Sequence, residues 1–322
     1  MINSSILENK QKVLVTGATG FIGINLVRRL SGPDFQVHIL LRSGTNISKI
    51  KDILPKTITH EVDLKESTKL KRVVKEINPK FIFHLATAGI FPSSQKTPAK
   101  RIVETNVLGT INLITACEDI DYKCFINTGS SSEYGLKDYP MKETDTCEPV
   151  NLYGITKLAS TLYAQMESLV KNKPILTLRL FSPYGPYDTT RRLIANVTIR
   201  ALKNYPLTLA SPNTTRDYVF IKDVLDAYTL CMSRGHKFAG EIFNIGSGKT
   251  HTTHSIVTKI LKITNSKSKV LWNYLPVNSQ EPKIWQADTS KSKKLLNWRP
   301  KNSLDSGLAK TIAWSRMNLN LL

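Results

Sequence analysis

The stretch Val13-Leu14-Val15-Thr16-Gly17-Ala18-Thr19-Gly20-Phe21-Ile22-Gly23 decides the fold of this chain. A short apolar run, typical of a buried strand, leads directly into three glycines, and apolar residues with helical spacing follow up to Leu30. Such glycines let the chain reverse, let the backbone approach a pyrophosphate, and let the helix lie close to the strand. The spacing is three and three rather than the usual two and three, and a tight turn without a ligand is the alternative. We predict a dinucleotide site at the amino end of this helix.

Strands and helices alternate beyond this turn. We expect strands at 36–41, 58–62, 81–85, 124–128 and 175–180, and helices at 68–77, 103–117 and 151–169. This order predicts the α/β class, with a doubly wound parallel (Rossmann) sheet and a smaller C-terminal substrate-binding lobe. The dinucleotide-binding domain is expected at 11–181 plus 217–248, where 217–227 and 241–245 would rejoin the main sheet. The lobe is expected at 182–216 plus 249–322.

Composition excludes several classes of protein. The 322 residues are 41% hydrophobic and 22% charged, as in ordinary soluble domains. The net charge of +20 is concentrated near the C-terminus, since residues 249–322 carry 13 Lys and Arg against three Asp and Glu. No tight basic block is interleaved with aromatic residues, so we expect no nucleic-acid partner. A solvated surface is the simpler interpretation, and a positive field that attracts small anions is the other.

The sequence gives no sign of a membrane segment or a metal site. No apolar stretch is long enough to span a bilayer, and residues 1–10 lack the basic start and apolar centre of a signal peptide. The four cysteines are scattered without the spacing of metal ligands. We therefore expect a cytoplasmic protein with reduced thiols, no membrane association and no metal.

The end of the second expected strand bears on the choice of cofactor. Enzymes that prefer NAD usually have an acidic residue there, which holds the ribose 2′-hydroxyl. This chain has Arg42 and Ser43 instead. A guanidinium can pair with a 2′-phosphate, so NADP(H) is favoured over NAD(H), although Arg42 could also be an ordinary surface arginine. Asp63 and Leu64, after the third strand, could lie at the adenine ring.

Three side chains form a candidate catalytic set. Ser130 follows the strand at 124–128, where a hydroxyl can hydrogen-bond a substrate carbonyl or alcohol. Tyr153 and Lys157 are spaced to share one face of a helix. Since a free tyrosine has a pKa near ~10, a lysine and the positive nicotinamide beside it would favour the phenolate. An exposed Tyr–Lys pair without function is the alternative.

These motifs resemble the extended short-chain dehydrogenase/reductase family over nearly the whole chain. The resemblance rests on the glycine turn, His84-Leu85-Ala86, Asn106, Ser130, Tyr153-x-x-x-Lys157, and later runs that begin at Arg179, Arg216 and Asp288. It implies a Rossmann domain, a nicotinamide cofactor and a nucleotide-diphosphate sugar substrate, with Tyr153 as the acid/base and Lys157 on the nicotinamide ribose. The cofactor contacts that it implies are Gly17, Thr19, Gly20, Phe21, Ile22, Gly23, Arg42, Ser43, Asp63, Leu64, Leu85, Ala86, Thr87, Asn106, Tyr153 and Lys157.

The residues after Ser130 narrow the choice of reaction. Members similar to nucleotide-sugar 4,6-dehydratases have Asp-Glu there, whereas this chain has Ser131 and Ser132, with Glu133 one position late. We therefore favour an NADPH-dependent reductase of an NDP-4-keto-6-deoxyhexose, in which Tyr153 protonates the oxygen at C4. An NAD-dependent nucleotide-sugar 4-epimerase is the alternative. A non-catalytic basic family member that binds RNA or protein is a third.

Substrate contacts are assigned to Ser131, Ser132, Arg191 and Arg216. A guanidinium suits the diphosphate, although Arg191 could equally be surface charge. The family often has an arginine shortly before Glu281-Pro282, and Val277-Asn278-Ser279-Gln280 stands there instead. The resemblance also suggests a homodimer through the helices at 103–117 and 151–169.

Overall fold

The computed structural model describes residues 10–90, 97–275 and 284–321, so the departure at Val277–Gln280 lies outside the described residues. The chain forms two compact units. The first comprises Met1–Glu133, Asn151–Leu178 and Tyr228–Ile242. The second comprises Tyr134–Val150, Arg179–Ala227 and Phe243–Leu322.

A seven-stranded sheet forms the centre of the first unit, in the order β11-β6-β5-β4-β1-β2-β3. The chain reverses its direction of winding at β1, which pairs in parallel with β2 on one side and with β4 on the other. The doubly wound sheet predicted from the sequence is thereby confirmed. The strands are β1 (Gln11–Thr16), β2 (Phe35–Leu41), β3 (Thr57–Glu61), β4 (Phe81–His84), β5 (Cys124–Ser130), β6 (Ile175–Leu180) and β11 (Ile242–Ile245).

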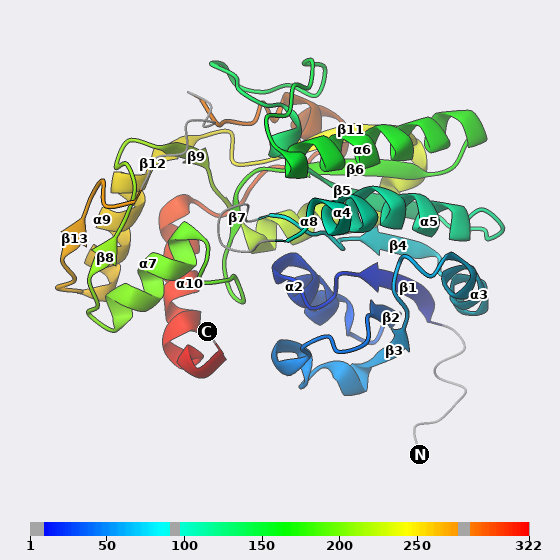
Figure 1. Cartoon of the computed structure of the whole chain (residues 1–322), viewed down its shortest axis with the longest axis horizontal. Coiled ribbons are helices and arrows are strands. Elements are labelled where there is room, and N and C mark those ends of the chain that lie inside the picture. The colour runs from blue at the N-terminus through cyan, green and yellow to red at the C-terminus, as the bar shows by residue number, and fades with distance from the viewer. Residues whose placement is uncertain (1–9, 91–96, 276–283, 322) are drawn as a thin grey trace. The chain divides into compact units, whose positions relative to one another are not determined.

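Helices cover both faces of this sheet (Figure 1). Helices α3 (Ser67–Ile77), α5 (Gly109–Ala116) and α6 (Leu152–Lys171) share one buried cluster with Ile82 of β4. The next residue of β4, Phe83, points to the other face and contacts Tyr228, with ring centroids 6.0 Å apart. Tyr228 belongs to α8 (Ile221–Arg234), which lies beside α2 (Phe21–Leu30) on that face. Because successive side chains of a strand point to opposite faces of the sheet, each strand packs against the helices on both faces.

One expectation about local structure was wrong, and another needs refinement. The segment 217–227 does not rejoin the main sheet, because it forms the end of β9 (Thr215–Asp217), β10 (Val219–Phe220) and the start of α8. Its apolar residues from Ile221 onward have helical rather than alternating spacing. The segment 103–117 is helical as expected but not regular. It begins with the last residue of α4 (Ala99–Val103), continues as a π-helical turn at Glu104–Leu108, and ends with α5.

The second unit contains three helices that pack together and three small sheets. The buried carboxylate of Asp217 accepts hydrogen bonds from the backbone of Ser247, Gly248 and Ala287, and thereby joins distant segments of this unit. The helices are α7 (Leu193–Leu202), α9 (Thr253–Thr264) and α10 (Leu304–Met317), and the further strands are β7 (Pro183–Tyr184), β8 (Leu207–Thr208), β12 (Thr250–Thr252) and β13 (Val270–Leu271).

Short helical turns complete both units, and within the described ranges no helix is both long and apolar enough to cross a membrane. These turns are Ser48–Ile50, Leu54–Lys56, Ser131–Glu133, Gly235–Lys237, Ser292–Leu296 and Leu319–Leu321.

Candidate active site

The glycine turn between β1 and α2 lies directly against the end of β4. Gly17 has a φ of +68°, and a Cβ on it would lie 2.7 Å from the backbone nitrogen of Ala86. A Cβ on Gly23 would lie 2.1 Å from the carbonyl oxygen of Gly17. Only glycine therefore permits this closeness of turn, strand and helix, which is the backbone form that a pyrophosphate requires.

The amino end of α2 carries neither a capping side chain nor a negative charge. Gly20 is the N-cap residue, and the first turn contains no acidic residue. Thr19, Phe21 and Ile22 are half-buried around this end. A helix of ten residues whose amino end has no capping side chain and no acidic residue in its first turn fits a bound phosphate group. The turn thus fits the dinucleotide that the sequence predicts.

A chain of buried hydrogen bonds fixes the ends of β1 and β4 relative to each other. The Thr110 hydroxyl donates to the carbonyl of Asn106 (2.7 Å), so its oxygen accepts from Nε2–H of His84 (2.9 Å). Nδ1 of His84 then accepts from the Thr16 hydroxyl (2.8 Å), and Thr16 in turn accepts from the backbone N–H groups of Leu85 and Ala86. Burial lowers the pKa of His84 to about 3, and the nearby charge of Lys157 adds to this effect. His84 is therefore a neutral structural link.

Asn106, in the π-helical turn, connects the loop after β4 to α6. Its amide oxygen accepts from the Ala88 N–H (2.8 Å) and the Thr87 hydroxyl (3.1 Å). Its amide nitrogen donates to the Ala88 carbonyl (3.0 Å) and to Oγ1 of Thr156 (2.9 Å). Thr156 lies between Tyr153 and Lys157, and its hydroxyl donates to the Tyr153 carbonyl. Asn106 thus fixes the helix that carries the predicted catalytic pair, Tyr153 and Lys157.

The catalytic hydroxyl predicted at Ser130 lies at the end of β5 and is nearly buried (8% exposed). Its Oγ accepts from the Ser132 N–H at 3.1 Å, and its own N–H donates to Oε1 of Glu133 at 2.7 Å. The same Glu133 oxygen accepts from the Thr161 hydroxyl of α6 at 3.1 Å. Backbone and side chain of Ser130 are therefore both held in place.

Tyr153 and Lys157 lie in the first turns of α6, which begins after the N-cap Asn151. The Asn151 side chain accepts from the Gly154 N–H at 2.9 Å, so the helix start is well defined. Tyr153 is half-buried, whereas Lys157 is 3% exposed. Burial lowers the pKa of Lys157 to about 8, and the negative charge of Glu133 opposes this shift. A buried cation one turn from a phenol favours the phenolate, as proton transfer requires.

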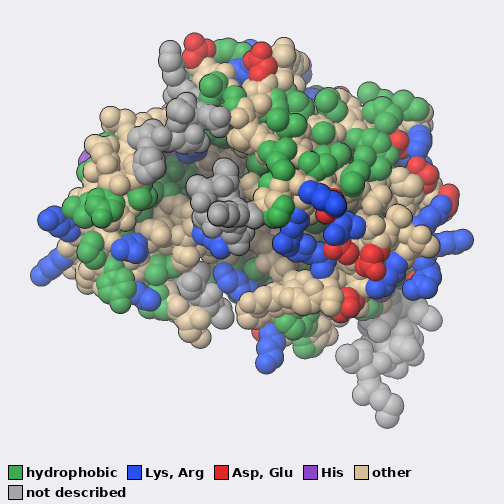
Figure 2. Space-filling view, viewed as in Figure 1, with side chains coloured by type: hydrophobic (Ala, Val, Ile, Leu, Met, Phe, Trp, Pro, Cys, Tyr) green, Lys and Arg blue, Asp and Glu red, His purple; other side chains and the backbone are tan. Residues whose placement is uncertain are grey.

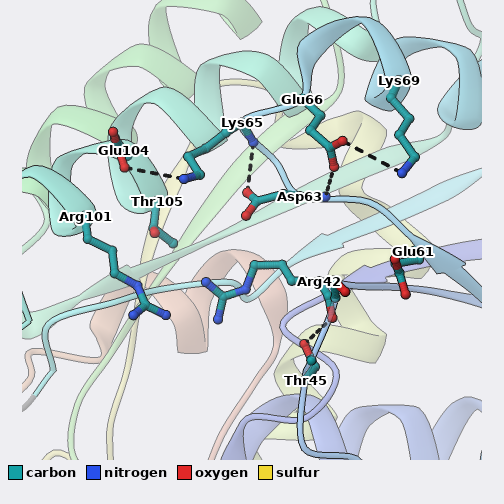
Figure 3. Close-up of a pocket in the computed structure, with 12 residues that line it drawn as sticks. Arg42, Thr45, Glu61, Asp63, Lys65, Glu66, Lys69, Arg101, Glu104 and Thr105 are labelled. Atoms are coloured by element: carbon teal, nitrogen blue, oxygen red, sulfur yellow. Dashed lines mark hydrogen bonds and ion pairs between the residues drawn. The ribbon is translucent and has the colours of Figure 1, made fainter.

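A second feature, the β2 pocket, lies at the ends of β2 and β3 and has a volume of about 620 Å³. Figure 3 shows the guanidinium groups of Arg42 and Arg101 directed toward each other across it. Lys65 pairs with Glu104 (3.6 Å) and Lys69 with Glu66 (3.8 Å), whereas no ion pair is seen for either arginine among the described residues. The pocket therefore has two cationic groups available for an anion. Its lining residues are Arg42, Ser43, Gly44, Thr45, Glu61, Asp63, Lys65, Glu66, Lys69, Arg101, Glu104 and Thr105.

Other predicted site residues lie elsewhere. The side chain of Leu64 is buried in the core cluster rather than lining the β2 pocket. Ser131 is buried and Ser132 half-buried in the turn after β5. In the second unit, Arg191 is exposed, and Arg216 lies over the Trp285 ring at 4.3 Å. No group of three or more potential metal ligands occurs in the part of the chain that the structure describes.

Comparison with known proteins identifies the family. The model of the NAD dependent epimerase/dehydratase family matches residues 13–246. The chain belongs to this family. It is 28% identical to dTDP-4-dehydro-6-deoxyglucose reductase of Escherichia coli, over 81% of this chain and 84% of that one.

Two solved structures agree with the family assignment. UDP-glucose 4-epimerase of Thermotoga maritima, solved with UDP-glucose, has a TM-score of 0.87 and 26% identity, covering 96% of this chain and 100% of that one. UDP-glucuronic acid 4-epimerase of Bacillus cereus, solved with UDP-glucuronic acid and NAD, has a TM-score of 0.85 and 26% identity, covering 95% and 99%. The chain is an enzyme of the nucleotide-sugar branch and binds a nicotinamide dinucleotide.

Sequence reasoning missed two residues of this region. Glu133 was set aside as one position late for a dehydratase, yet its carboxylate joins β5 to α6. Arg101 belongs to no motif and lies 59 residues from Arg42 in the sequence, yet both line the β2 pocket. The one signal for Arg101 was its position a few residues before Asn106. The local sequence does not indicate where the Arg101 side chain points.

Proposed function

We propose that this enzyme is an NADPH-dependent reductase of an NDP-4-keto-6-deoxyhexose. The hydroxyl, phenol and ammonium groups required for reduction are present at Ser130, Tyr153 and Lys157. No carboxylate stands at positions 131 and 132, which argues against elimination of water. The similarity to a dTDP-4-dehydro-6-deoxyglucose reductase favours a ketosugar as substrate.

The observation that carries the choice of NADPH is the pair of arginines in the β2 pocket. Arg42 takes the place after β2 where an NAD-preferring enzyme usually has an acidic residue. Arg101 reaches the same pocket from α4, and both guanidinium groups face its interior (Figure 3). Three of the four carboxylates that line the pocket have protein partners, since Glu104 and Glu66 pair with lysines and one oxygen of Asp63 accepts from the Lys65 N–H. Two planar cations suit a phosphomonoester such as a ribose 2′-phosphate.

Each of the three residues has a separate role in the proposed reaction. The bound nicotinamide cofactor supplies the hydride to C4 of the sugar. Ser130 hydrogen-bonds the carbonyl oxygen at C4 and orients it, while the Tyr153 hydroxyl gives its proton to that oxygen. Lys157 stabilises the phenolate that remains. Buried Thr16, His84 and Asn106 hold the strand ends and α6, so the three groups keep their positions as charge moves.

An NAD-dependent nucleotide-sugar 4-epimerase is the second candidate. Such an enzyme uses the same three groups, with a cofactor that takes the hydride and returns it. The likeness to the T. maritima and B. cereus epimerases supports this alternative directly. Asp63 and Glu61 in the β2 pocket could then accept from ribose hydroxyls. The non-catalytic alternative has less support, since it gives no reason for the buried Ser130–Glu133–Lys157 arrangement.

Substrate binding is proposed to involve the second unit. Arg216, with its guanidinium over Trp285, is a candidate for the diphosphate, and the exposed Arg191 is another. Ser131 and Ser132 would contact the sugar next to Ser130. In this proposal the cofactor belongs mainly to residues 11–181 plus 217–248, and the nucleotide sugar to 182–216 plus 249–322.

A homodimer through α6 is proposed on the exposed side chains of this helix. Ile155, Leu162, Met166 and Leu169 are between 43% and 67% exposed and recur at helical spacing along it. Hydrophobic side chains gather over α6 in Figure 2. Sedimentation at increasing concentration tests this proposal. Since all four cysteines are free thiols, we also propose a cytoplasmic location.

Cofactor use separates the candidate functions. The purified protein is titrated with NADPH and NADH, then incubated with dTDP-4-keto-6-deoxyglucose and, separately, with UDP-glucose. We expect tighter binding of NADPH, and one NADPH oxidised for each ketosugar reduced. Interconversion of UDP-glucose and UDP-galactose without net cofactor consumption would establish the epimerase instead. Tyr153→Phe is the control, because any activity that persists in it does not use this site.

A further inference from the structure

Glu133 lies between the two elements that carry the catalytic side chains. It ends the short helical turn after β5, and it is fully buried (0% exposed). One carboxylate oxygen accepts from the Ser130 N–H at 2.7 Å and from the Thr161 hydroxyl at 3.1 Å. Thr161 lies one helical turn beyond Lys157, on the same face of α6. This oxygen therefore joins the catalytic strand end directly to the catalytic helix.

The charge of Glu133 matters because Lys157 is buried as well. A buried ammonium loses hydration and tends to release its proton unless an anion lies near it. Glu133 provides a negative charge that raises the pKa of Lys157 against the larger effect of burial. His84 on β4 is neutral, because burial lowers its pKa to about 3. Among the described elements that pack against α6, α4 and the π-helical turn also carry Lys100, Arg101 and Glu104, and α6 itself carries Tyr153.

We propose that Glu133 is a positioning residue, which holds Ser130 at the strand end and keeps Lys157 charged in the working enzyme. The inference rests on the proposed roles of Ser130, Tyr153 and Lys157, and not on the choice of substrate or of NADPH. Without the carboxylate charge, Lys157 releases its proton at lower pH. Neutral Lys157 no longer favours the Tyr153 phenolate, and it binds the nicotinamide ribose less well.

Glu133→Gln is the decisive variant. The amide oxygen still accepts from Ser130 and Thr161, so the change removes the charge while preserving the hydrogen bonds. Binding of NADPH and of NADH is measured by fluorescence from about pH 6 to about pH 10, a range that includes ordinary and lowered lysine pKa values. We expect wild-type affinity to fall at alkaline pH, and the midpoint to move down by about one pH unit or more in E133Q. Lys157→Met should abolish this transition.

Glu167→Gln is the matched control. Glu167 is also a buried carboxylate on α6, ten residues beyond Lys157, and it pairs with Lys171 at 2.8 Å. E167Q should keep the wild-type midpoint. An unchanged midpoint in E133Q, or an equal shift in E167Q, would overturn the inference and leave the proposed function intact. Failure of the wild-type protein to bind either dinucleotide would overturn both.

Glu133→Asp provides a second test should E133Q not fold. The charge remains, but the shorter side chain cannot reach the Ser130 N–H as glutamate does. We expect the alkaline midpoint to stay near that of the wild type while the turnover number falls. A midpoint that moves down in E133D without loss of turnover would contradict the proposal.

Discussion

The catalytic region and the β2 pocket are built in opposite ways, although both lie at the carboxyl ends of strands in one sheet. Ser130, Glu133 and Lys157 are buried, and hydrogen bonds to Ser132 and Thr161 hold Ser130 and Glu133 in place. Arg42 and Arg101 are exposed on a cavity of about 620 Å³ and face each other without an acidic partner among the described residues. The groups proposed to perform the chemistry are thus held by the protein itself. The arginines proposed to select the cofactor would obtain their partner from the ligand.

This contrast predicts different consequences of substitution. A change in the buried region alters the rate of reaction or the fold, because neighbouring groups lose partners that nothing replaces. A change in the pocket should alter affinity for one cofactor and little else, because the two arginine side chains make no ion pair within the ranges that the structure describes. Substitutions in the two regions therefore test this difference.

The largest effect is expected for Tyr153→Phe, which removes the proton donor and preserves the ring. Turnover should fall by about 100- to 10,000-fold, while NADPH affinity stays within about threefold. Steady-state kinetics and fluorescence titration measure the two quantities. Tyr163→Phe, at a half-buried tyrosine of the same helix packed on the core, is the control and should retain activity. Equal losses in the two variants would place the chemistry elsewhere.

Arg42→Ala and Arg101→Ala should each weaken NADPH binding by about tenfold or more and leave NADH binding unchanged. A charge-assisted hydrogen bond contributes about 1.5–3 kcal/mol, which is the basis of this estimate. Calorimetric titration with both dinucleotides is the measurement. Arg72→Ala, an exposed arginine on α3 paired with Glu76, should affect neither cofactor. If NADPH and NADH affinities fall together, the pocket does not recognise the 2′-phosphate.

Gly23→Ala tests the close contact between turn and helix. The added Cβ would lie 2.1 Å from the Gly17 carbonyl oxygen, a backbone atom, so the turn must shift. We expect a loss of about 1–3 kcal/mol in the free energy of unfolding, with weaker binding of both dinucleotides. Gly32→Ala has no atom within 4 Å of its Cβ and should change stability by no more than about 0.5 kcal/mol. Denaturant titration compares them, and similar losses at both sites would refute the steric argument.

The smallest effect is expected from His38, whose Nδ1 lies 2.9 Å from Nε2 of His60 on β3. Burial lowers the pKa of His38 from 6.5 to about 4, with His60 and Lys12 contributing further. The unfolded chain therefore binds more protons at low pH. Stability is fully present above pH 6.5 and is lost as the pH falls toward 4. His38→Gln should reduce the drop in unfolding temperature between neutral and mildly acidic pH, by roughly 2 °C.

The sheet and the glycine turn could be predicted because their information is local. The helix at Phe21–Leu30 and the strand at Ile175–Leu180 have the bounds expected from the sequence. A strand that ends in glycine and precedes a helix leaves few alternatives for the backbone. The prediction for 217–227 was wrong because a short apolar run fits the period of a strand as well as that of a helix. The helical spacing becomes clear only when residues beyond 227 are included.

The connections between the candidate site residues could not be predicted, because they depend on where side chains point. Glu133 turns back to its own strand and across to α6, whereas its spacing from Ser130 suggested no role. Arg101 and Arg42 both line the β2 pocket only because the fold brings α4 close to the end of β2. The π-helical turn at Glu104–Leu108 also has no local signal, since its residues are compatible with an ordinary helix.

That π-helical turn has a consequence for deletions and insertions. A π turn contains one residue more than an α turn and turns through nearly the same angle, so α4 and α5 keep almost the phase of an uninterrupted helix. Deletion of Val107 would restore an ordinary turn and leave the direction of Arg101 nearly unchanged. Asn106 lies inside the π turn, so its own direction would change and it would move away from Thr156. The surplus residue thus serves the link between Asn106 and α6, and a homologue without it would have to hold α6 by another contact.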